Sequence, residues 1–145
     1  MTDDLLDPGM RRRILEVTQR LGALPEDLPA LGQATEDALP FCWSAPEGGW
    51  HLTVRERDRL LSDRFTDDPD EFVYWVAESV SERISLRLHP PENPGFRAAS
   101  WRTQYRLLSG VDPAWGEAWL GATRSALTAA GAGRAVLDML PQPPP

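Results

Sequence analysis

The stretch TDDPDEFVYWVAESVSERIS, residues 66–85, contains the start of the longest helix that the sequence predicts. Asp68 is a good N-cap, Pro69 fits the first helical position, and Glu71 stands where a capping box needs an acid. The stretch therefore predicts a long helix that begins at an acidic cluster and ends near Leu88. Apolar residues at helical spacing predict its buried stripe, which comprises Val73, Val76, Ala77, Val80 and Ile84.

The acids at this helix start, Asp68, Asp70 and Glu71, could also be a functional site. The free N–H groups of a helix start favour negative charge, by about 0.3–1 kcal/mol for each acid at an exposed terminus. The D-x-D-x-D-G spacing of a calcium loop is missing. We therefore interpret the cluster as helix capping in preference to a catalytic carboxylate pair.

The sequence before this helix predicts one helix and a small sheet. Residues 8–21 place Ile14, Val17, Thr18 and Leu21 on one stripe at helical spacing. A proline-containing run, residues 24–40, predicts a loop. Short segments with strand character follow at residues 41–45, 51–56 and 60–65, separated by the turn PEGG and by a second turn at residues 57–59.

The sequence after the long helix predicts two further helices. HPPENPG ends the long helix, a second helix covers residues 96–108, and Asp112 caps the last one. AAGAGR, residues 129–134, predicts the end of that helix. The predicted fold is α+β: an N-terminal helix, a small antiparallel three-stranded meander, and three helices packed on it. Residues 1–140 are predicted to form a single domain, and residues 141–145 a disordered proline-rich tail.

Charge restricts the kinds of partner that the chain can have. It has 22 acidic and 15 basic residues, for a net charge of −7. Residues 1–71 hold 16 acids and 8 arginines, whereas residues 72–145 hold 6 and 7. Non-specific nucleic-acid binding needs a basic surface, so this charge argues against nucleic acid. A charge-steered partner would instead be basic and would meet the N-terminal half.

Other features of the sequence predict a cytoplasmic protein. No apolar run approaches the roughly 20 residues that cross a bilayer, so no membrane partner is expected. The N-terminal residues lack the apolar region of a secretory signal. Cys42 is the single cysteine, which excludes an intramolecular disulfide framework and favours a reducing compartment.

Few residues have the pattern of a chemical site. Cys42, His51 and His89 lack the spacing of a zinc site, and no cofactor or metal is expected. A nucleophilic pair of Cys42 and His51 could form across the first hairpin, but a cysteine between Phe41 and Trp43 is more typical of a core.

Six tryptophans suggest a binding role, because this residue is enriched at interface hot spots. Trp43 and Trp50 flank the PEGG turn and are predicted to be exposed. The other four lie on or near helix stripes and are predicted to be core residues: Trp75, Trp101, Trp115 and Trp119.

Three segments of the chain resemble the immunity proteins of bacterial polymorphic toxin systems. The similarity extends over residues 50–119, and Glu56 and Arg57 resemble the Glu-Arg-Gly segment of that family, with Asp58 in place of the glycine. The matching positions further along are Asp70, Glu71, Tyr74, Trp75, Arg97, Trp101, Gln104, Leu107, Leu108, Pro113 and Trp115.

The resemblance implies a non-enzymatic cytoplasmic protein that binds one cognate toxin domain, expected to be basic, and neutralises it by occlusion. An intracellular adaptor or regulatory domain without catalytic activity is the alternative. A small enzyme that uses Glu56, Arg57 and Arg97 in a polar pocket is a third hypothesis. The candidate partner-binding residues are Trp43, Trp50, Glu56, Arg57, Asp63 and Arg97.

Overall fold

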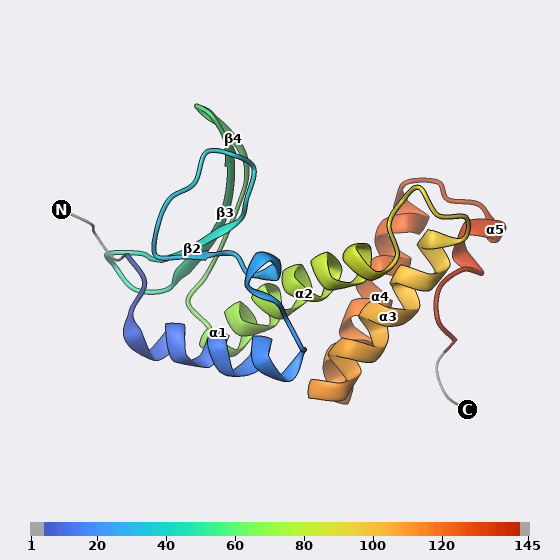
Figure 1. Ribbon diagram of the computed structural model, residues 1–145, viewed down its shortest axis with the longest axis horizontal. Helices are drawn as coiled ribbons and strands as arrows, with labels where there is room; N and C mark the ends of the chain where they lie inside the picture. Colours follow the sequence, from blue (N-terminus) through green and yellow to red (C-terminus); the bar gives the residue numbers. More distant parts are fainter. Residues whose placement is uncertain (1–4, 143–145) are drawn as a thin grey trace. The chain divides into compact units, whose positions relative to one another are not determined.

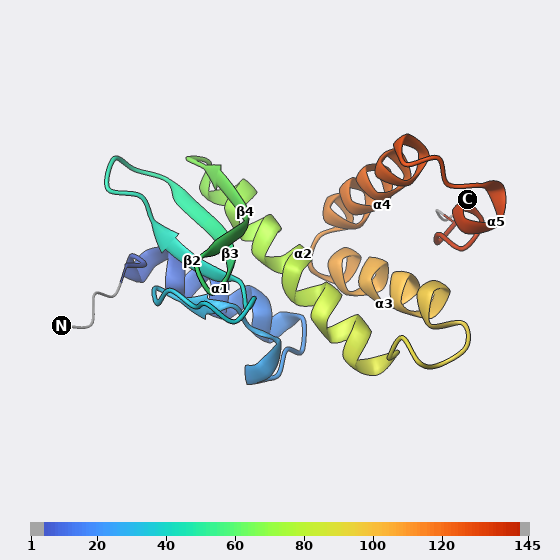
Figure 2. The ribbon, with the colours of Figure 1, turned by 90° about the horizontal axis from the view of Figure 1, so that it is seen from above.

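The computed structural model describes residues 5–142 and confirms the predicted α+β order of a helix, a sheet and then helices (Figures 1 and 2). The chain forms two compact units that divide between Val80 and Ser81, within the long helix. Whether residues 1–140 behave as one domain stays a prediction, and residues 143–145 of the predicted tail lie outside the described part. The elements are α1 (Pro8–Arg20), a 3-10 helix η1 (Pro25–Asp27), β1 (Ala30–Leu31), β2 (Phe41–Ser44), β3 (Trp50–Glu56), β4 (Arg59–Thr66), α2 (Pro69–Leu88), α3 (Phe96–Val111), α4 (Pro113–Ala129) and α5 (Arg134–Leu137).

The sheet of the first unit has four strands in the order β1-β2-β3-β4, where three were predicted. Strands β2, β3 and β4 form the expected antiparallel meander. The additional strand, β1, lies within the predicted loop and pairs parallel to β2. It is held by backbone bonds from Ala30 N to Pro40 O (2.9 Å) and from Gly32 N to Cys42 O (2.8 Å). Two residues are too few to show a strand periodicity, which is why the sequence did not indicate it.

The register of the meander separates two faces of the sheet. Trp43 pairs with His51, and His51 pairs with Phe65, so these three side chains lie in one row on one face. Side chains alternate along a strand, so Cys42 and Leu52 lie on the opposite face. We call the face with Trp43 the outer face and the other the inner face.

Helices α1 and α2 supply the partners of the inner face within the first unit. The Trp50 ring stacks on Phe72 of α2, with ring centroids 6.0 Å apart. Ile14 of α1 is fully buried, and the predicted α1 stripe is confirmed. The predicted stripe of α2 is also confirmed, since its five residues are all buried.

The start of α2 is capped mainly as predicted. Asp68 Oδ1 accepts hydrogen bonds from the backbone N–H groups of Asp70 (3.0 Å) and Glu71 (3.4 Å). In a full capping box, the Glu71 side chain would accept a hydrogen bond from the Asp68 N–H. Here the Asp68 N–H donates to Thr66 Oγ1 instead, at 3.1 Å. A threonine two residues earlier reaches this N–H within its own turn, so the capping box is only half formed. Asp70 also pairs with Arg13 of α1 at 2.8 Å.

The second unit contains the end of α2 together with α3, α4 and α5. Helices α3 and α4 approach closely at Gly116, where an added Cβ would lie 1.8 Å from Ser109 Oγ. Tyr105 donates a hydrogen bond of 3.1 Å to Glu117 across the same pair. Helix α4 ends at Ala129, before Gly131 with φ 82°, which confirms the predicted termination.

Two predictions for the helices need correction. The short helix α5 was not predicted, because four residues are too few for a helical pattern to be recognised. Among the tryptophans predicted to be core residues, Trp119 is buried, whereas Trp75, Trp101 and Trp115 are only half-buried. None of the helices within residues 5–142 is long and apolar enough to span a membrane.

Candidate partner-binding surface

Aromatic rings form a continuous row across the outer face of the sheet. Trp43 and His51 stack almost in parallel, with centroids 4.1 Å apart and an interplanar angle of 7°. His51 in turn contacts Phe65 at 4.9 Å with a tilt of 43°. Because one ring comes from each of β2, β3 and β4, the row fixes the relative positions of the three strands on this face.

A chain of hydrogen bonds runs beneath these rings and ends at Asp63. Trp43 Nε1 donates to Thr53 Oγ1 at 2.9 Å, and Thr53 Oγ1 donates to Asp63 Oδ1 at 2.7 Å. His51 Nδ1 lies 3.0 and 3.1 Å from the two carboxylate oxygens of Asp63. Thr53 is buried, whereas the Asp63 side chain is 33% exposed. The carboxylate is therefore held in one position and still presents accepting capacity to solvent.

A cavity of about 300 Å³ opens on the same face. Much of its wall is apolar, with Asp63 and Arg55 as its charged groups. Leu60, which lines the cavity, has 56% of its surface exposed, and Phe65, towards the other end of β4, has 51% exposed. Large apolar side chains that stay exposed on one face are typical of interaction surfaces. The lining residues are Leu5, Phe41, Trp43, Thr53, Arg55, Leu60 and Asp63.

Strand β4 forms the edge of the sheet beside this cavity. Every β4 side chain except Thr66 is exposed, and among the described residues no strand pairs with its far side. A register shift between Val54 and Arg55 lies opposite this strand. Gly49 lies against Phe65, near the C-terminal end of β4. Its φ is 87°, and a Cβ added there would lie 2.6 Å from the Phe65 ring.

Two of the six predicted contact residues, Trp43 and Asp63, meet on the outer face. The predicted exposure of Trp43 and Trp50 is wrong, because both are half-buried. Trp50 lies on the inner face instead, where its Nε1 donates to Asp7 Oδ1 at 2.7 Å. Asp7 also accepts from Ser44 Oγ at 2.8 Å and from Met10 N at 2.9 Å. Burial raises the pKa of Asp7, but these hydrogen bonds, the one from Trp50 foremost, outweigh it and leave the pKa below its ordinary value.

Glu56 and Arg57 occupy the exposed tip of the β3–β4 hairpin. Arg57 has φ 57°, in the left-handed region that favours glycine. The departure of Asp58 from the family glycine therefore does not set the hairpin geometry, because the left-handed residue is the preceding one. The segment at residues 36–38 runs beside this tip, with Arg57 N bonded to Glu36 O at 2.6 Å and Ala38 N bonded to Arg55 O at 2.7 Å.

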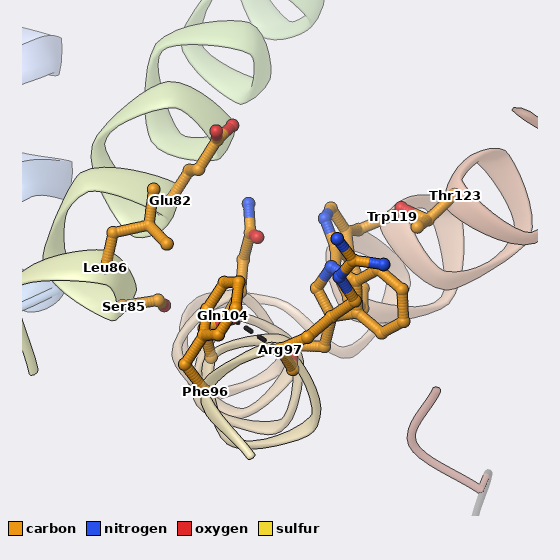
Figure 3. Close-up of a pocket in the computed structure, with 10 residues that line it drawn as sticks. Glu82, Ser85, Leu86, Phe96, Arg97, Gln104, Trp119 and Thr123 are labelled. Carbon is orange, nitrogen blue, oxygen red and sulfur yellow. Dashed lines mark hydrogen bonds between the residues drawn. The ribbon is translucent and has the colours of Figure 1, made fainter. Parts of the chain in front are cut away.

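Arg97 belongs to the second unit and lines a cavity of about 250 Å³ there. Its guanidinium carbon lies 5.9 Å from the ring centroids of both Phe96 and Trp101. Figure 3 shows Glu82 of α2 on one side of Gln104 and Arg97 on the other. Arg57 lies in the first unit, at the hairpin tip, and Arg97 lies in the second unit.

Cys42 and His51 do not form a nucleophilic pair. Cys42 pairs in register with Leu52 and faces the inner side, whereas His51 faces the outer side. Burial raises the pKa of the Cys42 thiol to about 12, so the reactive thiolate is suppressed at neutral pH. Within residues 5–142 no three or more His, Cys, Asp and Glu side chains are grouped to hold a metal ion.

Sequence reasoning missed His51, Leu60 and Phe65 as members of this surface. His51 was considered only as a nucleophile partner or a metal ligand. A tight turn at residues 57–58 alone would place Arg64 opposite His51, and the register shift between Val54 and Arg55 brings Phe65 there instead. Leu60 and Leu61 are adjacent apolar residues that break the alternation of β4, a sign of the register shift seen beside them.

More than half of the chain matches a known protein family. Residues 47–125 match the family described as immunity protein 63, a segment that includes β3, β4, α2, α3 and most of α4. No curated protein and no solved structure matches the chain.

Proposed function

Because the chain belongs to the immunity protein 63 family, we propose that it binds one cognate toxin domain and neutralises it by covering the toxin's active surface. The match to residues 47–125 carries this proposal, since it includes His51, Thr53, Asp63 and Phe65 of the outer face. An anchored carboxylate surrounded by exposed aromatic and aliphatic side chains suits a protein partner better than a small substrate.

The charge of the first unit supports a basic toxin. Residues 1–80 contain 17 acids and 8 arginines, a balance of −9. Such a field accelerates the approach of a basic partner and disfavours acidic ones. The chain acts in the cytoplasm of the cell that makes the toxin, without catalysing a reaction and without binding nucleic acid or membrane.

The test is co-expression with the toxin domain encoded beside this chain's gene. We expect restored growth, a complex that co-purifies, and loss of toxin activity that is complete at one chain per toxin. Protection at far below one chain per toxin would instead indicate catalytic inactivation. Unrelieved toxicity together with tight binding to a protein of the host cell would favour the adaptor alternative.

A further inference from the structure

The outer face and the edge of β4 together offer a binding site for an extended segment of the toxin. This inference rests on the proposed function. We propose that the toxin adds an extended segment to the edge of β4. In this arrangement, a basic side chain of the segment reaches Asp63 and an apolar side chain enters the cavity beside Leu60.

The first step in this argument is the backbone of β4. It spans residues 59–66 and lies at the end of the sheet, with exposed side chains along nearly its whole length. An uncovered strand edge presents unpaired N–H and C=O groups to any extended chain that approaches it. Peptide recognition by strand addition uses such an edge for affinity and the adjacent side-chain pockets for specificity.

The second step is the order of side chains on the outer face. Phe65, Asp63 and Leu60 follow one another along β4 as apolar, acidic and apolar positions. Opposed side chains on neighbouring strands lie about 4.5–5.5 Å apart at Cβ. The added segment therefore carries an apolar residue beside Phe65, a basic residue beside Asp63, and an apolar residue facing the cavity.

The third step is the selection of a basic residue at the central position. Asp63 is fixed by Thr53 Oγ1 at 2.7 Å and by His51 Nδ1 at 3.0 Å, so little further ordering is needed when a partner binds. An arginine or lysine would complete the unused accepting positions of this carboxylate with a charge-assisted hydrogen bond. Arg55 at the far end of the cavity disfavours a second cation there, which leaves that space to an apolar side chain.

The charge of the unit identifies the occupant as a different protein and not a second copy of this chain. Two copies would bring two units of balance −9 edge to edge, and like charges oppose such an association. A basic toxin is instead attracted by the negative charge of the first unit.

The experiment uses the full chain and the toxin domain encoded beside its gene. Affinity is measured for Asp63→Asn, Leu60→Ser and Phe65→Ser. Asp67→Asn is the control for charge, and Leu88→Ser is the control for exposed apolar area, since Leu88 is 53% exposed in the second unit. Amide hydrogen exchange of β4 is followed in the free chain and in the complex, and thermal melts verify that each variant is folded.

We expect each outer-face variant to weaken binding by about tenfold or more, the controls to change it by less than about threefold, and β4 amides to become protected in the complex. A complex of unchanged affinity for all three outer-face variants overturns this inference and leaves the proposed function standing. Weakened binding without protection of β4 overturns strand addition. Protection that rises with the concentration of the chain alone assigns the edge to a second copy. A toxin domain that does not bind the wild-type chain overturns the proposed function itself.

Discussion

Trp50 donates a hydrogen bond of 2.7 Å to Asp7, which lies 43 residues earlier in the chain and caps α1. The bond joins β3 to the N-terminus of α1. The Trp50 indole N–H therefore stabilises the contact between the sheet and the helix and also orients the carboxylate that caps the helix. We predict that Trp50→Phe, which keeps a ring against Phe72 but removes the donor, lowers the free energy of unfolding by about 1–3 kcal/mol. Urea titration at neutral pH measures this loss.

The same pair predicts a pH dependence. The pKa of Asp7 is lowered in the folded chain, so its stabilising effect is fully present above the unfolded value of about 3.9. The effect is lost as the pH falls through the folded value. The stability difference between wild type and Trp50→Phe should therefore shrink in acid. A difference that is the same at neutral pH and near pH 2 would contradict the role of the Asp7 charge.

The acidic cluster at the start of α2 predicts a stability effect without a binding effect. Asp68→Ala removes the acceptor for two backbone N–H groups and should cost about 0.5–2 kcal/mol of unfolding free energy. Asp67→Ala, at the adjacent position outside the cap, is the control and should cost less. Loss of toxin binding in an Asp68→Ala protein of unchanged stability would show that the cluster is a contact site.

The burial of Cys42 predicts that its thiol is unreactive. The side chain is fully buried and its pKa is raised to about 12 by that burial. A thiol reagent should label the native chain far more slowly than the urea-unfolded chain at neutral pH, since the thiolate is the reactive form. Equal labelling rates in the two states would refute the assignment of Cys42 to the core.

Arg57 offers a way to separate hairpin geometry from partner contact. Glycine adopts φ 57° without the steric cost that arginine has, so Arg57→Gly should leave thermal stability unchanged or slightly higher. If the arginine contacts the toxin, affinity falls while the fold is retained. Unchanged affinity would assign Arg57 to the turn alone.

Salt should act on association more than on dissociation. Exposed charges are screened over about 8 Å at physiological ionic strength, and peripheral charges chiefly affect the rate of association. The association rate with a basic toxin should therefore fall steeply between low and physiological salt, as stopped-flow or surface binding kinetics can measure. A rate that is indifferent to salt over this range would exclude electrostatic steering.

The sequence predicted those parts of the fold that depend on local patterns. The cap at Asp68, the buried stripe from Val73 to Ile84 and the turn near residues 57–59 each follow from neighbouring residues, although β4 begins one residue earlier than predicted. The sequence did not predict strand β1 or the acceptor of the Asp68 N–H. Periodicity shows neither which strand a two-residue segment pairs with nor which side chain accepts from a given N–H.

The candidate surface was predicted only in part for a similar reason. Trp43 and Trp50 flank the same turn, and flanking a turn suggested exposure for both. Both are half-buried instead, on opposite faces, because strand alternation places Trp43 on the outer face and Trp50 on the inner face. The meeting of Trp43, Thr53 and Asp63 required the register of three strands, which no single segment specifies.

The contact between Gly49 and Phe65 constrains how this family can diversify. Any side chain at position 49 would collide with the ring at position 65 and would also strain a backbone of φ 87°. An added Cβ would also lie 2.8 Å from the backbone oxygen of Thr66, which no change at position 65 relieves, so glycine is expected at position 49 in members of the family. Phe65 itself is 51% exposed, so position 65 is free to vary in size and polarity while position 49 stays glycine.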